Sequence, residues 1–217
     1  MNFPELYHKY NREIWLTLTT IVWVLPYIFI NKISVGRTEM SFNIYFDSVF
    51  PVLPVMVLIY VSSFVMVFMP YFFVKEKERF KAVAKGYLVA MLVGYITFLL
   101  LPIKALRPLI TNTDIFSKML QVLYSQDLPY NSFPSLHVGL SMLSALIIIH
   151  ENKKWGREML IWAVLIAIST LATKQHTLAD VMGGIAVSLL GYFVFLRIIK
   201  NESHQSTRII EIGSRSY

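Results

Sequence analysis

The sequence predicts an all-α, polytopic membrane protein, and three observations lead to that prediction. Hydrophobic residues make up 56% of the 217 residues, and the mean hydropathy is +0.57. Charged residues make up only 15%, against about 25% in typical soluble domains. Apolar runs of about 20 residues, the length a helix needs to cross the hydrocarbon core, recur along the chain. No polar linker divides it, so we expect one membrane-embedded domain over residues 1–217.

Six transmembrane helices are expected from these runs. The runs are Glu13–Ile30, Pro51–Val74, Gly86–Ile103, Leu136–His150, Met159–Thr173 and Thr177–Ile199. Before the first run, apolar residues at helical spacing predict that residues 1–12 form a short helix on the membrane surface. After the last run, residues 201–217 form a polar tail.

The distribution of Lys and Arg predicts how the helices are oriented. With the N-terminus inside, fourteen of the 20 Lys and Arg residues fall on the inner side and six on the outer side. Cytoplasmic segments carry an excess of these residues, so we expect both termini inside and segments 31–50, 104–135 and 174–176 outside. This pattern suits a bacterial plasma membrane. It also accounts for the net charge of +7, which therefore does not indicate a nucleic-acid partner.

A histidine and an aspartate open the sixth run. His176 and Asp180 are four residues apart, which places them on one side of a helix. The carboxylate can accept a hydrogen bond from Nδ1–H of the imidazole and leave Nε2 to act as a nucleophile or base. Asp180 lies just inside an apolar segment, where an ionisable residue indicates function. The alternative is a structural His–Asp pair that ties two helices together.

A second histidine, His137, begins the fourth run on the same outer face. Pro134 suits the first turn of a helix, whose N-terminal amides attract anions, and Ser135 adds a hydroxyl donor. This stretch is therefore a candidate anion site. An interfacial histidine preceded by an ordinary helix cap is the alternative.

Three cations border the same face. Lys104 and Arg107 follow the third run directly, and Lys174 lies two residues before His176. An arginine followed by a proline suggests a fixed phosphate clamp, although cations that reach from a helix end to the interface would look the same.

Two histidines, a carboxylate and cations are the parts that phosphoryl transfer requires. One histidine attacks phosphorus, the other protonates the leaving oxygen, and the cations hold the phosphate oxygens. Two histidines and a carboxylate could also bind a metal. The neighbouring cations argue against that alternative, because they repel a divalent ion. The absence of cysteine excludes disulfides, thiolate metal sites and a cysteine nucleophile.

At these residues the sequence resembles the type-2 phosphatidic acid phosphatase superfamily, whose motifs are K-x6-R-P, P-S-G-H and S-R-x5-H-x3-D. The corresponding residues are Arg107-Pro108, Pro134-Ser135-Leu136-His137, and Ser169-Thr170 followed at the same spacing by His176 and Asp180. The resemblance covers residues 103–184 and implies a six-helix bundle of this family. It implies that His176 is the nucleophile, Asp180 its orienting partner and His137 the general acid.

The resemblance also implies that phosphate is bound by Arg107, Ser135, Lys104 and Lys174, without a metal or any other cofactor. Three positions depart from the motifs: Leu100 stands in place of Lys, Leu136 in place of Gly and Thr170 in place of Arg. Either Lys104 or Lys174 could supply the missing charge. With these departures the sequence resembles the branch of the superfamily that includes inositol phosphorylceramide synthase and sphingomyelin synthase. The segment 46–60, with Asp47 and Tyr60, is also similar to a segment of that branch.

Three functions follow as hypotheses. The first is a lipid phosphatase that hydrolyses a phosphate monoester or pyrophosphate at the outer membrane face through a phosphohistidine. The second is a phosphotransferase that passes a phospho-headgroup to an alcohol. The third is a non-catalytic lipid-binding or transport protein. In each case the partners are a lipid phosphate and the bilayer, while the lipid, the acceptor and the oligomeric state stay open.

Overall fold

The computed structural model describes residues 3–37, 40–42 and 44–214, and the prediction of an all-α fold is confirmed. The helices are α1 Phe3–Ile33, α2 Tyr45–Val49, η1 Pro54–Met56, α3 Val57–Val61, α4 Ser63–Phe73, α5 Lys77–Leu100, α6 Ile115–Gln126, α7 Leu136–Glu151, α8 Lys153–Ala172 and α9 Leu178–Ser214. Within the described ranges, the only extended pairing is an isolated bridge between Met40 and Ile103.

Among the described residues, five helical stretches are long and apolar enough to cross a membrane, so the chain is a multipass membrane protein. They are Lys9–Ile33, Pro54–Phe73, Lys77–Leu100, Lys153–Ala172 and Leu178–Asn201. The fourth predicted run forms α7, which is apolar but has only 16 residues. The second run is not one continuous helix, because it is divided into η1, α3 and α4.

The short helix α7 lies among longer ones. It packs against α4, α8 and α9, while α5 packs against α1 and α9. A glycine lets α9 approach the beginning of α7, since a Cβ atom at Gly184 would lie only 2.5 Å from the carbonyl oxygen of Ser135. Small residues allow this kind of close helix packing in membranes. The contact brings the first turn of α9, with Asp180, to the first turn of α7, with His137.

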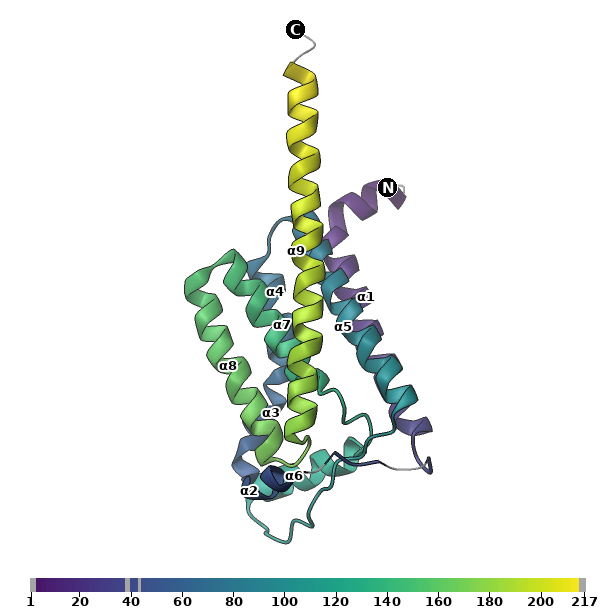
Figure 1. The fold of residues 1–217 in the computed structure, drawn as a ribbon, viewed down its shortest axis with the longest axis vertical. Coiled ribbons are helices and arrows are strands. Elements are labelled where there is room, and N and C mark those ends of the chain that lie inside the picture. The colour runs from purple at the N-terminus through teal and green to yellow at the C-terminus, as the bar shows by residue number, and fades with distance from the viewer. Residues whose placement is uncertain (1–2, 38–39, 43, 215–217) are drawn as a thin grey trace.

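The two ends of the bundle differ. Both termini lie at one end, and α2, α6 and the segments that precede α7 and α9 lie at the other (Figure 1). The side of the membrane that each end faces stays a prediction.

Both terminal segments are helical where the structure describes them. The backbone of α1 is non-helical at Tyr10, and the part before it turns away from the rest of the helix (Figure 1). A short helix on the membrane surface over residues 1–12 stays a prediction, and residues 1–2 lie outside the described residues. The polar C-terminal segment continues α9 as far as Ser214.

Candidate functional site

A tight turn between α8 and α9 presents His176 to the interior. The carbonyl oxygen of Thr170 accepts hydrogen bonds from the backbone N–H groups of Gln175, at 3.1 Å, and His176, at 3.2 Å. Lys174 adopts a left-handed conformation, with a φ of 52°, and this reverses the chain. Thr170, which stands where the family motif has an arginine, is fully buried and helps to close the turn.

The imidazole of His176 is oriented mainly by a backbone group. Its Nδ1 donates to the carbonyl oxygen of Ser132 at 3.0 Å, whereas Oδ2 of Asp180 lies 3.6 Å from Nδ1. The second distance is longer than a normal hydrogen bond. With the proton on Nδ1, Nε2 carries a lone pair. Asp180 was expected to orient the imidazole of His176, but Ser132 is its main hydrogen-bond partner and Asp180 contributes less.

Asp180 organises the loop that orients His176. Its side chain is fully buried, and Oδ2 accepts hydrogen bonds from the backbone N–H of Thr177, at 2.7 Å, and from the hydroxyl of Ser132. Its other oxygen, Oδ1, is buried with no partner among the described residues. By holding Ser132, Asp180 fixes the position of the carbonyl group that binds His176.

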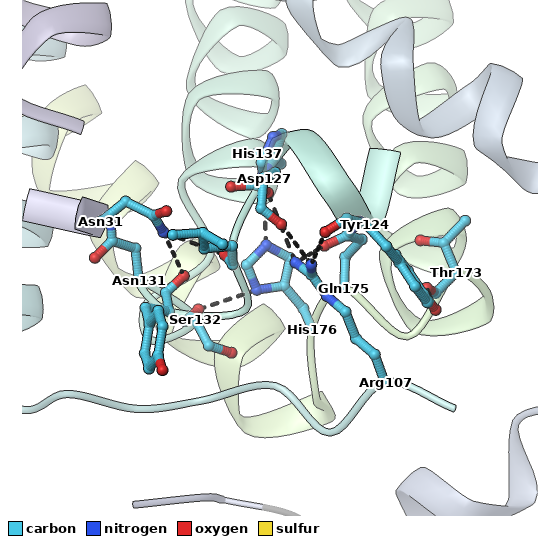
Figure 2. A network of polar contacts seen from close by, with 12 residues as sticks. Asn31, Arg107, Tyr124, Asp127, Asn131, Ser132, His137, Thr173, Gln175 and His176 are labelled. Atoms are coloured by element: carbon cyan, nitrogen blue, oxygen red, sulfur yellow. Dashed lines mark hydrogen bonds and ion pairs between the residues drawn. The ribbon is translucent and has the colours of Figure 1, made fainter. Parts of the chain in front are cut away.

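The second histidine faces the first (Figure 2). Nδ1 of His137 lies 3.4 Å from Nε2 of His176. The hydroxyl of Tyr60 lies 2.9 Å from Nε2 of His137. One set of tautomers is consistent with all these contacts: Tyr60 donates to His137, His137 donates to His176, and His176 donates to Ser132. In this set His137 holds a proton on Nδ1 beside the lone pair on Nε2 of His176.

Arg107 is held beside this pair. Its guanidinium donates to the backbone oxygens of Tyr124 and Asp127 and to the side-chain oxygen of Gln175, the residue before His176 (Figure 2). It also lies 3.7 Å from Oδ2 of Asp127, and its side chain is only 10% exposed. A guanidinium held at several points keeps a fixed direction, which suits recognition of phosphate oxygens.

The other predicted phosphate ligands occupy different settings. Ser135 is fully buried, and its hydroxyl caps α7 by accepting from the N–H of Val138. The ammonium of Lys104 lies 5.8 Å from the centre of the Tyr130 ring. The ammonium of Lys174 donates to the backbone oxygens of Asp47 and Phe50, each at 2.6 Å.

A cavity of about 670 Å³ lies in front of His176. We call it the phosphate-side cavity, because its lining includes Arg107 and Lys174 as well as His176. Neither Ser135 nor Lys104 is among its lining residues. The segment that covers it is fastened by Asp47, whose Oδ1 accepts from the N–H of Leu178 at 2.8 Å.

Sequence reasoning missed Ser132, Gln175 and Asp127. Ser132 acts on His176 through a backbone oxygen, which any residue type provides, so the sequence contains no signal for it. Gln175 stands next to His176, and this adjacency was the available signal. Asp127 is an acidic residue in a segment that also carries Arg107, and burial raises the pKa of its carboxyl while Arg107 opposes that rise. Tyr60 lies in the segment 46–60, whose resemblance pointed to function without assigning a role.

The described acidic and imidazole side chains of the site are not arranged as a metal centre. Among the described residues, no group of three or more His, Cys, Asp or Glu side chains is placed to hold a metal ion. Nδ1 of His176 is hydrogen-bonded to Ser132, and Nε2 of His176 faces Nδ1 of His137. The two imidazoles therefore point toward each other and not toward a common metal position.

The fold and the site define the class to which the chain belongs. It is a helical membrane protein with two facing histidines, a buried carboxylate and a fixed arginine. The model of the PAP2 superfamily matches residues 35–194, more than half of the chain, so this protein belongs to the PAP2 superfamily. It is therefore a member of a family of phosphatase- and phosphotransferase-type lipid enzymes. The comparisons with curated proteins and with solved structures each found no match.

Proposed function

We propose that this protein is a lipid phosphatase that works through a phosphohistidine on His176. The observation that carries the proposal is the pair of facing imidazoles, with Nδ1 of His137 lying 3.4 Å from Nε2 of His176. The Nδ1–H of His176 is committed to Ser132, so the lone pair on Nε2 is the one available for attack. Arg107 lies beside it, where developing negative charge on the phosphate would need stabilisation.

The reaction has two steps that mirror each other. In the first, the lone pair on Nε2 of His176 forms a bond to phosphorus while the ester P–O bond breaks. Its electrons leave on the alcohol oxygen, which takes the proton from Nδ1 of His137. His137 enters this step as the imidazolium, with its second proton taken up from solution, and ends it as the neutral imidazole. In the second, water attacks phosphorus, His137 accepts its proton, and the P–N bond breaks to release phosphate. The two imidazoles must move apart to admit the phosphoryl group, since their nitrogens now lie within contact of each other.

The activity is tested with purified protein and a panel of lipid phosphates. We expect phosphate release from at least one of phosphatidic acid, phosphatidylglycerophosphate, a polyprenyl pyrophosphate or a sphingoid phosphate. We also expect an acid-labile phosphoryl label on the protein that His176→Ala abolishes. Consumption of the lipid without phosphate release would instead indicate transfer to an alcohol. Binding without consumption would indicate the non-catalytic alternative.

A chelation arm of the same assay tests the role of metals. We expect activity to survive EDTA, because the proposed charge stabilisation comes from Arg107. Loss of activity on chelation, with recovery when a divalent ion is added, would contradict this and restore the metal alternative.

We also propose that the site faces the outer side of the membrane, as the Lys and Arg distribution predicts. Asn112 lies in the segment before α6, and Glu78 lies in the first turn of α5 at the opposite end; both are exposed. Since the chain has no cysteine, a single cysteine at either position can be labelled without background. On intact cells, an impermeant reagent should label Asn112→Cys and spare Glu78→Cys. The reverse pattern would invert the orientation.

A further inference from the structure

A second cavity, of about 310 Å³, reaches the histidine pair from the other side. We call it the tail-side cavity. Its lining is mainly apolar and aromatic and comes from α1, α3, α4, α6 and α7. The lining residues used below are Tyr27, Tyr60, Ser63, Leu123, Asp127 and His137. It shares no lining residue with the phosphate-side cavity.

The histidine pair therefore divides the two cavities. His176 lines the phosphate-side cavity and His137 lines the tail-side cavity, while their nitrogens lie 3.4 Å apart. A phosphate ester held at this boundary would place its phosphoryl group on the side of Arg107. The alcohol, which His137 protonates, would lie on the other side. An apolar lining formed partly by the membrane helices α1 and α4 suits the chain of such an alcohol.

Polar groups interrupt this apolar lining near His137. Oδ1 of Asp127 accepts a hydrogen bond from the hydroxyl of Tyr27 at 2.9 Å, and Oδ2 lies 3.7 Å from Arg107. Ser63 is 1% exposed, and its hydroxyl has no partner among the described residues. A carboxylate offers about four acceptor positions, so Asp127 can accept further hydrogen bonds. Polar groups in an apolar cavity are costly unless they are hydrogen-bonded, and a ligand with a hydroxyl would satisfy them.

We propose that the tail-side cavity binds the alcohol part of the substrate and that Asp127 accepts a hydrogen bond from a free hydroxyl on it. The substrate class is then a lipid phosphate whose apolar chain carries a hydroxyl near the phosphate ester, in preference to one with no such hydroxyl. This inference rests on the proposed phosphatase reaction for its placement of the phosphate. It adds Asp127 as a residue that determines specificity.

The test compares two lipids that differ in one hydroxyl. Monooleoylglycerol phosphate has a free hydroxyl beside the phosphate ester, and its deoxy analogue has hydrogen there. A hydrogen bond to a charged group corresponds to a preference of about 10- to 100-fold in kcat/KM for the hydroxyl-bearing lipid. In Asp127→Leu this ratio should fall toward one. Arg107 keeps its bonds to the backbone oxygens and to Gln175 in that variant, and any general loss affects both lipids and cancels in the ratio.

A second variant tests the cavity itself. Leu123→Trp should fill it and lower kcat/KM for both lipids by at least about tenfold, the loss expected when an apolar pocket rejects its ligand. Its matched control is Val122→Trp, at the neighbouring position of α6, which is 60% exposed and is not part of this lining. Equal effects of the two tryptophans would overturn the assignment of the cavity.

A binding measurement separates this inference from the proposed reaction. Thermal stabilisation by monooleoylglycerol and by its analogue without the middle hydroxyl requires no catalysis. A hydroxyl preference in binding that Asp127→Leu removes would support the inference even if no phosphate were released. Turnover of both lipids at the same rate by the unaltered protein would overturn the inference while leaving the phosphatase intact.

Discussion

The two ends of the helical bundle differ in how deeply their charged side chains are buried. At the end with the histidine pair, Asp180 is fully buried, and the side chain of Arg107 is 10% exposed. At the other end, Arg79 pairs with Glu151 at 3.0 Å, and its side chain is 42% exposed. Burial of polar and charged groups lowers stability unless each finds partners, whereas exposed pairs contribute little in either direction. The polar groups that the fold keeps buried are therefore the ones for which function is the better explanation.

The histidines at the two ends show the same difference in burial. His176 is buried and hydrogen-bonded to Ser132, with its second nitrogen facing His137. His150, near the opposite end of α7, is exposed and lies edge-on to the ring of Phe195, with 5.6 Å between the ring centres. The two residues have the same chemistry, and only the first is placed to use it.

The largest expected effect comes from removing the nucleophile. His176→Ala should lower kcat by at least about 10⁴-fold, since loss of a nucleophile that acts together with its partners removes most of the catalysis. His137→Ala should cost about 10²–10⁴-fold, the usual contribution of a general acid. The measurement is kcat on the preferred lipid phosphate from the panel, with folding checked by circular dichroism.

His150→Ala is the matched control for this comparison and should keep nearly full activity. Near-normal turnover by a well-folded His176→Ala protein would refute the phosphohistidine. A large loss in His150→Ala would show that burial does not distinguish the two ends.

An intermediate effect is expected for Asp180→Asn. The hydrogen bonds from Thr177 and Ser132 both go to Oδ2, and an amide oxygen at that place can still accept them, so the fold should persist. The amide is neutral, however, so its bond to Ser132 is weaker than that of a carboxylate and its attraction for His176 is lost. We expect kcat to fall about 10- to 100-fold, the loss typical when an outer hydrogen-bond partner of a functional histidine is changed. The effect should be smaller than that of His176→Ala because the carbonyl oxygen of Ser132 still receives Nδ1–H. A loss as large as that of His176→Ala, in a folded protein, would mean that Asp180 takes part in the chemistry directly.

The membrane-spanning segments could be predicted from the sequence because the bilayer imposes their length and apolar composition. Five of the six runs correspond to helices long enough to cross. The break in the second run at Ser62 was not predicted. Ser62 and Ser63 stand within an otherwise apolar run, and the hydrogen bond from the hydroxyl of Ser62 to the carbonyl oxygen of Ile59, at 2.6 Å, is not visible in a hydropathy pattern.

The site was predictable where it depends on spacing and hidden where it depends on the path of the chain. The four-residue spacing of His176 and Asp180 predicts that their side chains lie close together, and they are 3.6 Å apart. The prediction of a shared helix face was wrong, because His176 lies in the turn before α9, which begins at Leu178. The approach of Ser132 to His176 depends on how the segment before α7 crosses the turn before α9, which no local pattern encodes. Asp127 joins the region for the same reason, since it lies next to Arg107 only in the folded chain.

The smallest expected effect concerns Lys174, for which the sequence left two interpretations open. Its ammonium already donates to the backbone oxygens of Asp47 and Phe50, which leaves one of its three donors for a phosphate oxygen. Lys174 also lines the phosphate-side cavity, so its charge acts on any bound phosphate. We expect Lys174→Gln to lower kcat/KM about tenfold, at or below the lower limit seen when a dedicated stabilising donor is removed. Lys174→Arg should retain part of the activity, because the charge persists while the geometry changes.

The matched control is Lys118→Gln, an exposed lysine on α6 to which no role is assigned. Equal, small effects at both positions would remove Lys174 from the site and leave Arg107 to hold the phosphate. A loss of several hundredfold confined to Lys174→Gln would instead give it the role of the arginine that Thr170 replaces. Lys174 would then act on the phosphate directly, and its bonds to the segment over the cavity would have to open when substrate binds.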